Sequence, residues 1–109
     1  MQSELPFTTV APSPKLATIQ ARFEEFHRLN PWVYTKLVSM SRSVQAKGHK
    51  RIGMKTLFEV LRWRFYEQTF DPTSRWHLNN SYTSRYARLI EANELDLQSF
   101  FETRELLTE

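Results

Sequence analysis

LNNSYTSRYARLIE, at residues 78–91, combines a signal for the start of a helix with apolar side chains at helical spacing. Asn80 or Ser81 can cap this helix, because a short polar side chain accepts a hydrogen bond from a free N–H group of the first turn. The apolar side chains that follow repeat at helical intervals: Tyr82, Tyr86, Leu89 and Ile90. This spacing predicts a helix that buries one face in the core of the domain.

Arg85 and Arg88 lie one turn apart on the other side of this predicted helix, with Thr83 and Ser84 nearby. Arginine binds phosphate and guanine through paired N–H donors, so both side chains are candidates for contacts with DNA. They could equally belong to the solvated side of an interior helix. A helix-turn-helix joins its helices through about three or four residues, whereas a much longer segment precedes this helix. The sequence therefore favours only an atypical, winged-helix-like form of that fold.

Three more helices are predicted from apolar side chains that repeat at helical spacing, over residues 16–29, 31–47 and 54–66. Asn30 followed by Pro31 indicates the start of the second helix, because Asn caps free N–H groups and Pro at the first helical position loses no hydrogen bond. Gly48 is expected to end this helix in the left-handed conformation. Gly48 and Gly53 bracket the basic segment GHKRIG, and both tolerate positive φ.

Proline and turn residues predict an arm and a hairpin on either side of these helices. Residues 1–15 hold three of the five prolines and no helical repeat, so we expect an extended N-terminal arm. The segment DPTS at 71–74 fits a type I turn. It joins YEQTF (66–70) to RWHLN (75–79), which alternate apolar and polar residues and predict a small β-hairpin.

A short acidic helix is predicted at the C-terminal end from Leu97, Phe100 and Phe101.

The composition limits the possible fold classes. With 109 residues, 40% hydrophobic and 14% aromatic, the chain can build one real core. We therefore expect residues 16–109 to form a single, mainly α-helical domain: a compact bundle of about five helices with a small β-hairpin. No membrane-length apolar run or leader pattern is present, which predicts a cytoplasmic protein without a membrane partner.

The net charge of +3 is unevenly distributed. Residues 31–64 contain many Lys and Arg residues with Glu59 as the single carboxylate, whereas residues 91–109 are strongly acidic. A basic region of this kind favours a polyanionic partner. The residues predicted to bind double-stranded DNA are Lys47, Lys50, Arg51, Lys55, Arg62, Arg85 and Arg88. The alternative is that these side chains only keep the protein soluble.

The aromatic residues next to this basic region have two interpretations. They could stack on bases, but we expect them to pack in the core or in the hairpin, because aromatic residues near helical stripes usually pack. The residues in question are Trp63, Tyr66, Phe70 and Trp76.

The residues and their spacing do not favour an enzyme. The chain has no cysteine and no phosphate-binding loop or nucleophile motif. His27, His49 and His77 lie far apart and lack metal-ligand spacing, so no metal and no cofactor is expected. The acidic segment EANELD, with Glu91, Glu94 and Asp96, is interpreted as a solvated helix junction and not as a magnesium site.

Five segments in this order resemble a family of small proteins encoded by bacteriophages and prophages. They are NPWVY (30–34), the basic loop GHKRIG, LRW (61–63), NNSYTSRYARLIE (79–91) and FFETR (100–104). The resemblance covers roughly residues 20–104. It implies a phage or prophage origin and expression inside a bacterial cell, and it carries over no catalytic or binding residue.

Three functions compatible with that origin remain open. The protein could act as a DNA-binding regulator through the basic residues named above, which is the hypothesis that we favour. It could instead inhibit a host protein, for example an antiviral defence component, through exposed aromatic residues and the acidic segment 94–105. A structural role in the virion is the third and weakest possibility.

Overall fold

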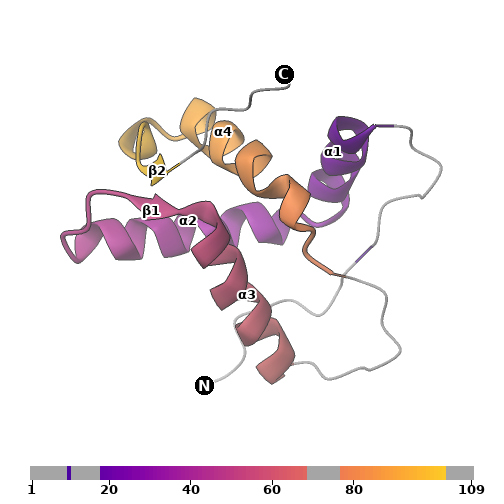
Figure 1. Cartoon of the computed structure of the whole chain (residues 1–109), viewed down its shortest axis with the longest axis horizontal. Coiled ribbons are helices and arrows are strands. Elements are labelled where there is room, and N and C mark those ends of the chain that lie inside the picture. The colour runs from indigo at the N-terminus through magenta and orange to yellow at the C-terminus, as the bar shows by residue number, and fades with distance from the viewer. Residues whose placement is uncertain (1–9, 11–17, 69–76, 103–109) are drawn as a thin grey trace.

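Four α-helices and a two-stranded sheet form the part of the chain that the structure describes, which confirms the mainly helical class (Figure 1). The computed structural model describes residues 10, 18–68 and 77–102. The elements are α1 (Ile19–Leu29), α2 (Pro31–Ala46), β1 (Ile52–Gly53), α3 (Met54–Gln68), the 3-10 helix η1 (Asn80–Tyr82), α4 (Thr83–Asn93), the 3-10 helix η2 (Leu95–Leu97) and β2 (Phe101–Glu102). Within these ranges, each helix is too short or too polar to cross a lipid bilayer.

Local signals explain where the first two helices begin. Thr18 Oγ1 accepts a hydrogen bond from the Ala21 N–H at 3.0 Å, and α1 begins at Ile19. Pro31 occupies the first turn of α2, as predicted. The Asn30 side chain makes no capping hydrogen bond to α2. That part of the prediction is wrong, because the amide group of Asn30 is used in a different contact.

Asn30 is completely buried and ties the N-terminal part of the chain to the end of α1. Its Oδ1 accepts a hydrogen bond from the Val10 N–H at 2.8 Å. Its Nδ2 donates to the Val10 carbonyl at 2.6 Å and to the Phe26 carbonyl at 3.1 Å. A buried amide requires such partners. The predicted arm, residues 1–15, lies outside the described residues except for Val10.

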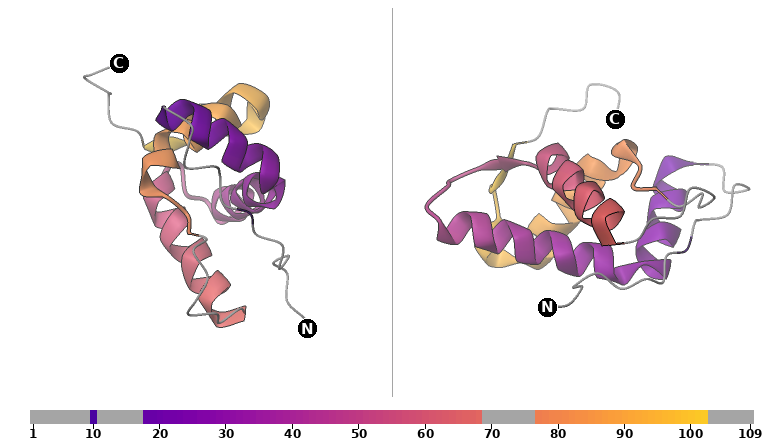
Figure 2. Two further views of the ribbon diagram at one scale, coloured as in Figure 1. Left: turned by 90° about the vertical axis from the view of Figure 1, so that its right-hand side faces the viewer. Right: turned by 90° about the horizontal axis from the view of Figure 1, so that it is seen from below.

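Helix α4 forms the centre of the core, and the three views show it packed among the other helices (Figures 1 and 2). Tyr86 and Ile90 are fully buried. The Tyr86 ring lies edge-on to Phe23 of α1, with ring centroids 4.9 Å apart, and to Phe58 of α3, at 6.0 Å. Such edge-to-face contacts add to the hydrophobic burial. The predicted inward face of this helix is confirmed, although Leu89 is only half-buried.

The C-terminal end of the described chain pairs with β1, and the predicted fifth helix is wrong. Ile52 lies opposite Phe101 in a parallel pair, and its N–H donates to the Phe100 carbonyl at 3.0 Å. Ser99 has φ of +61°, which stops any helix at this point. The extended backbone beyond it allows the adjacent Phe100 and Phe101 to be buried together. Only the 3-10 helix η2 replaces the expected terminal helix.

The predicted hairpin is also not formed as expected. Its first segment, residues 66–70, begins inside α3, because the helix continues to Gln68 and keeps its internal hydrogen bonds. The turn at 71–74 lies outside the described residues. The strands that the structure does show are parallel and distant in sequence, unlike a hairpin. The winged-helix-like arrangement is therefore not confirmed.

Candidate nucleic-acid interface

The turn between α2 and β1 exposes a cluster of basic side chains. Gly48, with φ of +100°, ends α2 in the left-handed conformation, as predicted. The chain then runs as an exposed loop to β1, whose pairing with β2 holds the far end of the loop. We call the exposed basic side chains of this loop and of the first turn of α3 the cationic loop: Lys47, Lys50, Arg51 and Lys55.

None of these basic side chains is neutralised within the described ranges. The salt bridges there involve Arg28 and Arg42, and the cationic loop makes no side-chain hydrogen bond to a described residue. The first turn of α3 contains Lys55 and no acidic residue. The amino end of a helix carries a partial positive charge, which adds to the charge of the loop. The Glu102 carboxylate of β2 lies beside Gly53 at this end of α3, so the charge of the loop is the main attraction for an anion.

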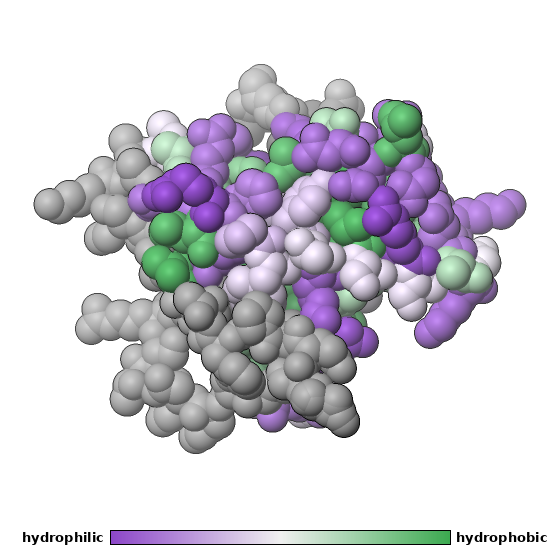
Figure 3. Space-filling model, turned by 180° about the vertical axis from the view of Figure 1, so that it is seen from behind, coloured by the Kyte–Doolittle hydropathy of each residue, from purple (hydrophilic) through white to green (hydrophobic). Residues whose placement is uncertain are grey.

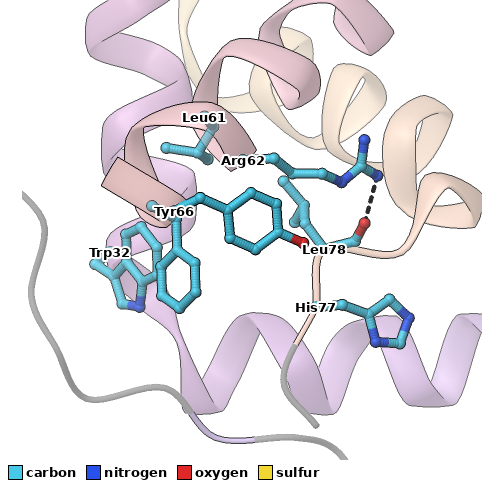
Figure 4. A pocket seen from close by; sticks show the side chains of 7 residues that line it. Trp32, Leu61, Arg62, Tyr66, His77 and Leu78 are labelled. Carbon is cyan, nitrogen blue, oxygen red and sulfur yellow. Dashed lines mark hydrogen bonds between the residues drawn. The ribbon is translucent and has the colours of Figure 1, made fainter. Parts of the chain in front are cut away.

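Arg62 makes contacts inside the protein. Its Nη2 donates a hydrogen bond to the Leu78 carbonyl (Figure 4). It also donates to Asn80 Oδ1. Its guanidinium group also lies 5.9 Å from the centre of the Phe58 ring. These contacts hold the segment before η1 against α3. Arg62 was predicted as a DNA contact, and the structure places it in this internal role.

Arg85 is attached to α1, on the other side of the molecule from the cationic loop. Its Nε donates to Gln20 Oε1 at 2.9 Å, and its Nη1 donates to the Ser81 carbonyl at 3.3 Å. The views show α1 at one end of the molecule and the α2–β1 loop at the other (Figures 1 and 2). Arg88 is exposed one turn further along α4. The structure thus divides the predicted DNA-binding residues between two separate regions.

The acidic segment after α4 binds Arg42 of α2. Arg42 Nε and Nη2 lie 2.9 Å and 3.1 Å from the Asp96 carboxylate oxygens, and Nη2 lies 2.7 Å from Glu94 Oε1. The hydrogen bond from Arg42 lowers the pKa of the Asp96 carboxyl group. Tyr34 donates to Glu94 Oε2 at 2.9 Å, and Gln45 Nε2 donates to the Asp96 carbonyl at 2.8 Å. These residues therefore join α2 to the end of α4.

The titratable side chains do not assemble into a metal site in the ranges that the structure describes. His27 packs against the rings of Phe23 and Tyr34, and burial lowers its pKa. His49 and His77 are exposed on different segments.

Two aromatic residues of α3 are largely exposed, so the expectation that they pack in the core is wrong for both. The exposed fractions are 64% for Trp63 and 59% for Tyr66. Val60, on the same helix, is also exposed. We call Trp63 and Tyr66, with the neighbouring Val60, the aromatic face. Trp76 and Phe70 lie outside the described residues.

A signal in the sequence could have identified Trp63 as exposed. The buried residues of α3 include Leu57, Phe58 and Leu61. Trp63 follows the exposed Glu59 by four residues, so it belongs to the polar side of the helix. Helical position therefore predicts its exposure better than its hydrophobicity does.

A shallow hollow lies beside Tyr66, but it is too small for a metabolite. Figure 4 shows Tyr66 reaching from α3 toward Leu78, with Trp32 on the opposite side. The space has room for about one water molecule, whereas small-molecule pockets typically hold about 300 Å³ or more. Seen from behind, the described hydrophobic residues form small separate groups among hydrophilic ones (Figure 3). The cationic loop and the aromatic face are thus the candidate functional features.

No protein family, curated protein or solved structure matches this chain.

Proposed function

We propose that this protein is a small phage- or prophage-encoded regulator that binds nucleic acid through its cationic loop. The observation that carries this proposal is the group of exposed basic side chains without an acidic partner among the described residues. Neutralising phosphates with Lys and Arg releases counterions, which supplies most of the affinity of non-specific binding.

The predicted arginines outside the cationic loop are expected to contribute less to nucleic-acid binding. Arg85 is held by Gln20 and by the Ser81 carbonyl, and reorienting it toward a phosphate would break these hydrogen bonds. Arg62 would have to leave the Leu78 carbonyl. We therefore expect Lys50 and Arg51 to contribute more to binding than Arg85 and Arg88 do.

A pair of double variants with equal charge tests this proposal. Lys50→Ala with Arg51→Ala is compared with Arg85→Ala with Arg88→Ala, and fluorescence anisotropy measures the affinity for labelled DNA across a salt series. The loop variant should bind roughly tenfold or more weakly. The slope of its log affinity against log salt concentration should become shallower by about 0.9 for each lost phosphate contact. The Arg85 and Arg88 variant should change less. Failure of the wild-type protein to bind any nucleic acid at low salt would overturn the proposal.

Binding to a host protein is the second candidate function, and the exposure of Trp63 favours it. Trp and Tyr are frequent among the residues that contribute most to protein interfaces. Glu94 and Asp96 are already engaged by Arg42, so the aromatic face is a better candidate surface than the acidic segment. A pull-down from bacterial lysate with nuclease present would recover a stoichiometric host protein if this function is correct. An unrelated protein of similar charge is the control.

A further inference from the structure

We propose that the nucleic acid bound by this protein is single-stranded, and that Trp63 and Tyr66 stack on its unpaired bases. This inference rests on the proposed function and adds the class of ligand. It follows from the way in which α3 connects the cationic loop to the aromatic face.

One member of the cationic loop, Lys55, lies on the same side of α3 as the two exposed rings. Lys55 is in the first turn of α3, and Trp63 and Tyr66 follow it by eight and eleven residues. At 3.6 residues per turn, these three positions fall within one exposed side of the helix, opposite the buried Leu57 and Leu61. The helical rise separates Lys55 from Trp63 by roughly 12 Å along the axis. A short extended strand can span this distance with its phosphates at the loop and its bases at the rings.

Both rings keep most of their surface exposed in the described part of the fold. Trp63 is 64% exposed, although burying a large ring is one of the most favourable contributions available to a small domain. Tyr66 makes a ring contact with its neighbour Phe65, with centroids 6.0 Å apart, and still exposes more than half of its surface. Each side chain therefore offers ring surface to a ligand.

Unpaired bases fit this surface better than a duplex does. The bases of a duplex are stacked on one another and present only their edges in the grooves. A single strand presents base faces that stack on aromatic side chains, while a positively charged groove follows its backbone. The cationic loop supplies that charge.

Glu59 provides a test of the path of the strand. It is exposed on the helix between Lys55 and Trp63. A phosphate backbone that follows this side of α3 would be repelled by its carboxylate. Glu59→Gln should therefore strengthen binding, whereas a strand that binds elsewhere would be unaffected.

The experiment compares an oligothymidylate of about 16 nucleotides with a duplex of the same length, using anisotropy at moderate salt. The wild-type protein should prefer the single strand. Trp63→Ala should weaken binding of the single strand roughly 5- to 100-fold with an unchanged salt dependence, because a stacked base is lost and no phosphate contact is. Trp63→Phe should restore most of the affinity. Leu95→Ala, which removes another highly exposed apolar side chain, is the matched control.

The possible results separate this inference from the proposed function. Equal affinity for the duplex and no effect of Trp63→Ala, with binding still lost in the loop variant, would overturn the inference and leave the proposed function intact. Absence of any binding by the wild-type protein would overturn both. If Trp63→Ala abolished nuclease-resistant capture of a host protein but left oligonucleotide binding unchanged, the aromatic face would be a protein interface and the inference would be wrong.

Discussion

Asn30 shows how a single residue can satisfy a local signal in the sequence and still serve a different purpose in the fold. The Asn-Pro pair marks the start of α2, and the helix does begin at Pro31. The Asn30 amide, however, binds the backbone of Val10 and of Phe26. The hydrogen bond to the Phe26 carbonyl is buried and those to Val10 are partly buried, so losing them is costly.

Asn30→Ala should lower the free energy of unfolding by about 1–3 kcal/mol, because it removes the hydrogen bonds from this side chain to Phe26 and Val10, one of which is buried. Urea denaturation measures this change, and hydrogen exchange at the Val10 amide should become faster. Gln98→Ala, at an exposed side chain, is the control and should have little effect. An Asn30→Ala variant as stable as the Gln98 variant would show that the contact with Val10 contributes nothing.

At the scale of elements, the two glycines at the ends of the basic loop have different functions. Both tolerate positive φ, but of the two only Gly48 adopts it, with φ of +100°. Gly48 ends α2 and sets the direction in which the loop leaves. Gly53 lies in β1, where the conformation is accessible to other residues.

Gly48→Ala should destabilise the protein by about 1–2 kcal/mol, since a Cβ atom is unfavourable at this φ. No atom lies within 4 Å of the added Cβ, so the cost comes from the backbone and not from a clash. Gly53→Ala is the matched control: its Cβ would lie 3.8 Å from Glu102 Oε1, an ordinary contact, and stability should change much less. Thermal unfolding of the two variants compares them, and equal losses would contradict the distinction.

At the scale of the whole molecule, Arg42 and its acidic partners hold together segments that lie far apart in the chain. Arg42 extends from α2, and Asp96 belongs to η2 beyond α4. The ion pairs are on the surface, where such contacts are individually weak. Two carboxylates sharing one guanidinium group with paired hydrogen bonds are nevertheless a favourable arrangement.

The pH dependence of stability tests this contact. Because the folded protein lowers the pKa of Asp96 below the value of 3.8, the carboxylate contributes stability above that value, and the contribution is lost as pH falls through the lowered pKa. Arg42→Ala should therefore reduce stability at pH 7 and flatten its decline below about pH 4. Arg28→Ala, which breaks a longer surface pair of 3.8 Å with Glu25, is the control. Urea midpoints at several pH values measure the stability of the wild-type protein and of both variants. An equal loss of stability below about pH 4 in the wild-type protein and in Arg42→Ala would contradict the prediction.

The sequence alone determined the helical class, the start of α2 at Pro31, its end at Gly48 and the inward face of α4. These features depend on hydrogen bonds and side-chain spacing within a few residues, which the order of residues specifies directly. The C-terminal segment differs, because Phe100 and Phe101 were predicted in a helix and lie instead at a short strand. Their strand forms by pairing with β1, and a local pattern does not contain the position of a distant partner.

Only the tertiary structure decided how the candidate residues are used. All the arginines of the basic region look alike in the sequence, but Arg62 binds the Leu78 carbonyl inside the protein, while Arg51 is exposed on the loop. Trp63 has a large apolar side chain of the kind that usually fills a core. It is nevertheless exposed, because other side chains of α3 already fill the core face of the helix. The physical reason is the same in each case. Exposure and pairing depend on which surfaces meet when the helices pack, and segments distant in the chain determine those contacts.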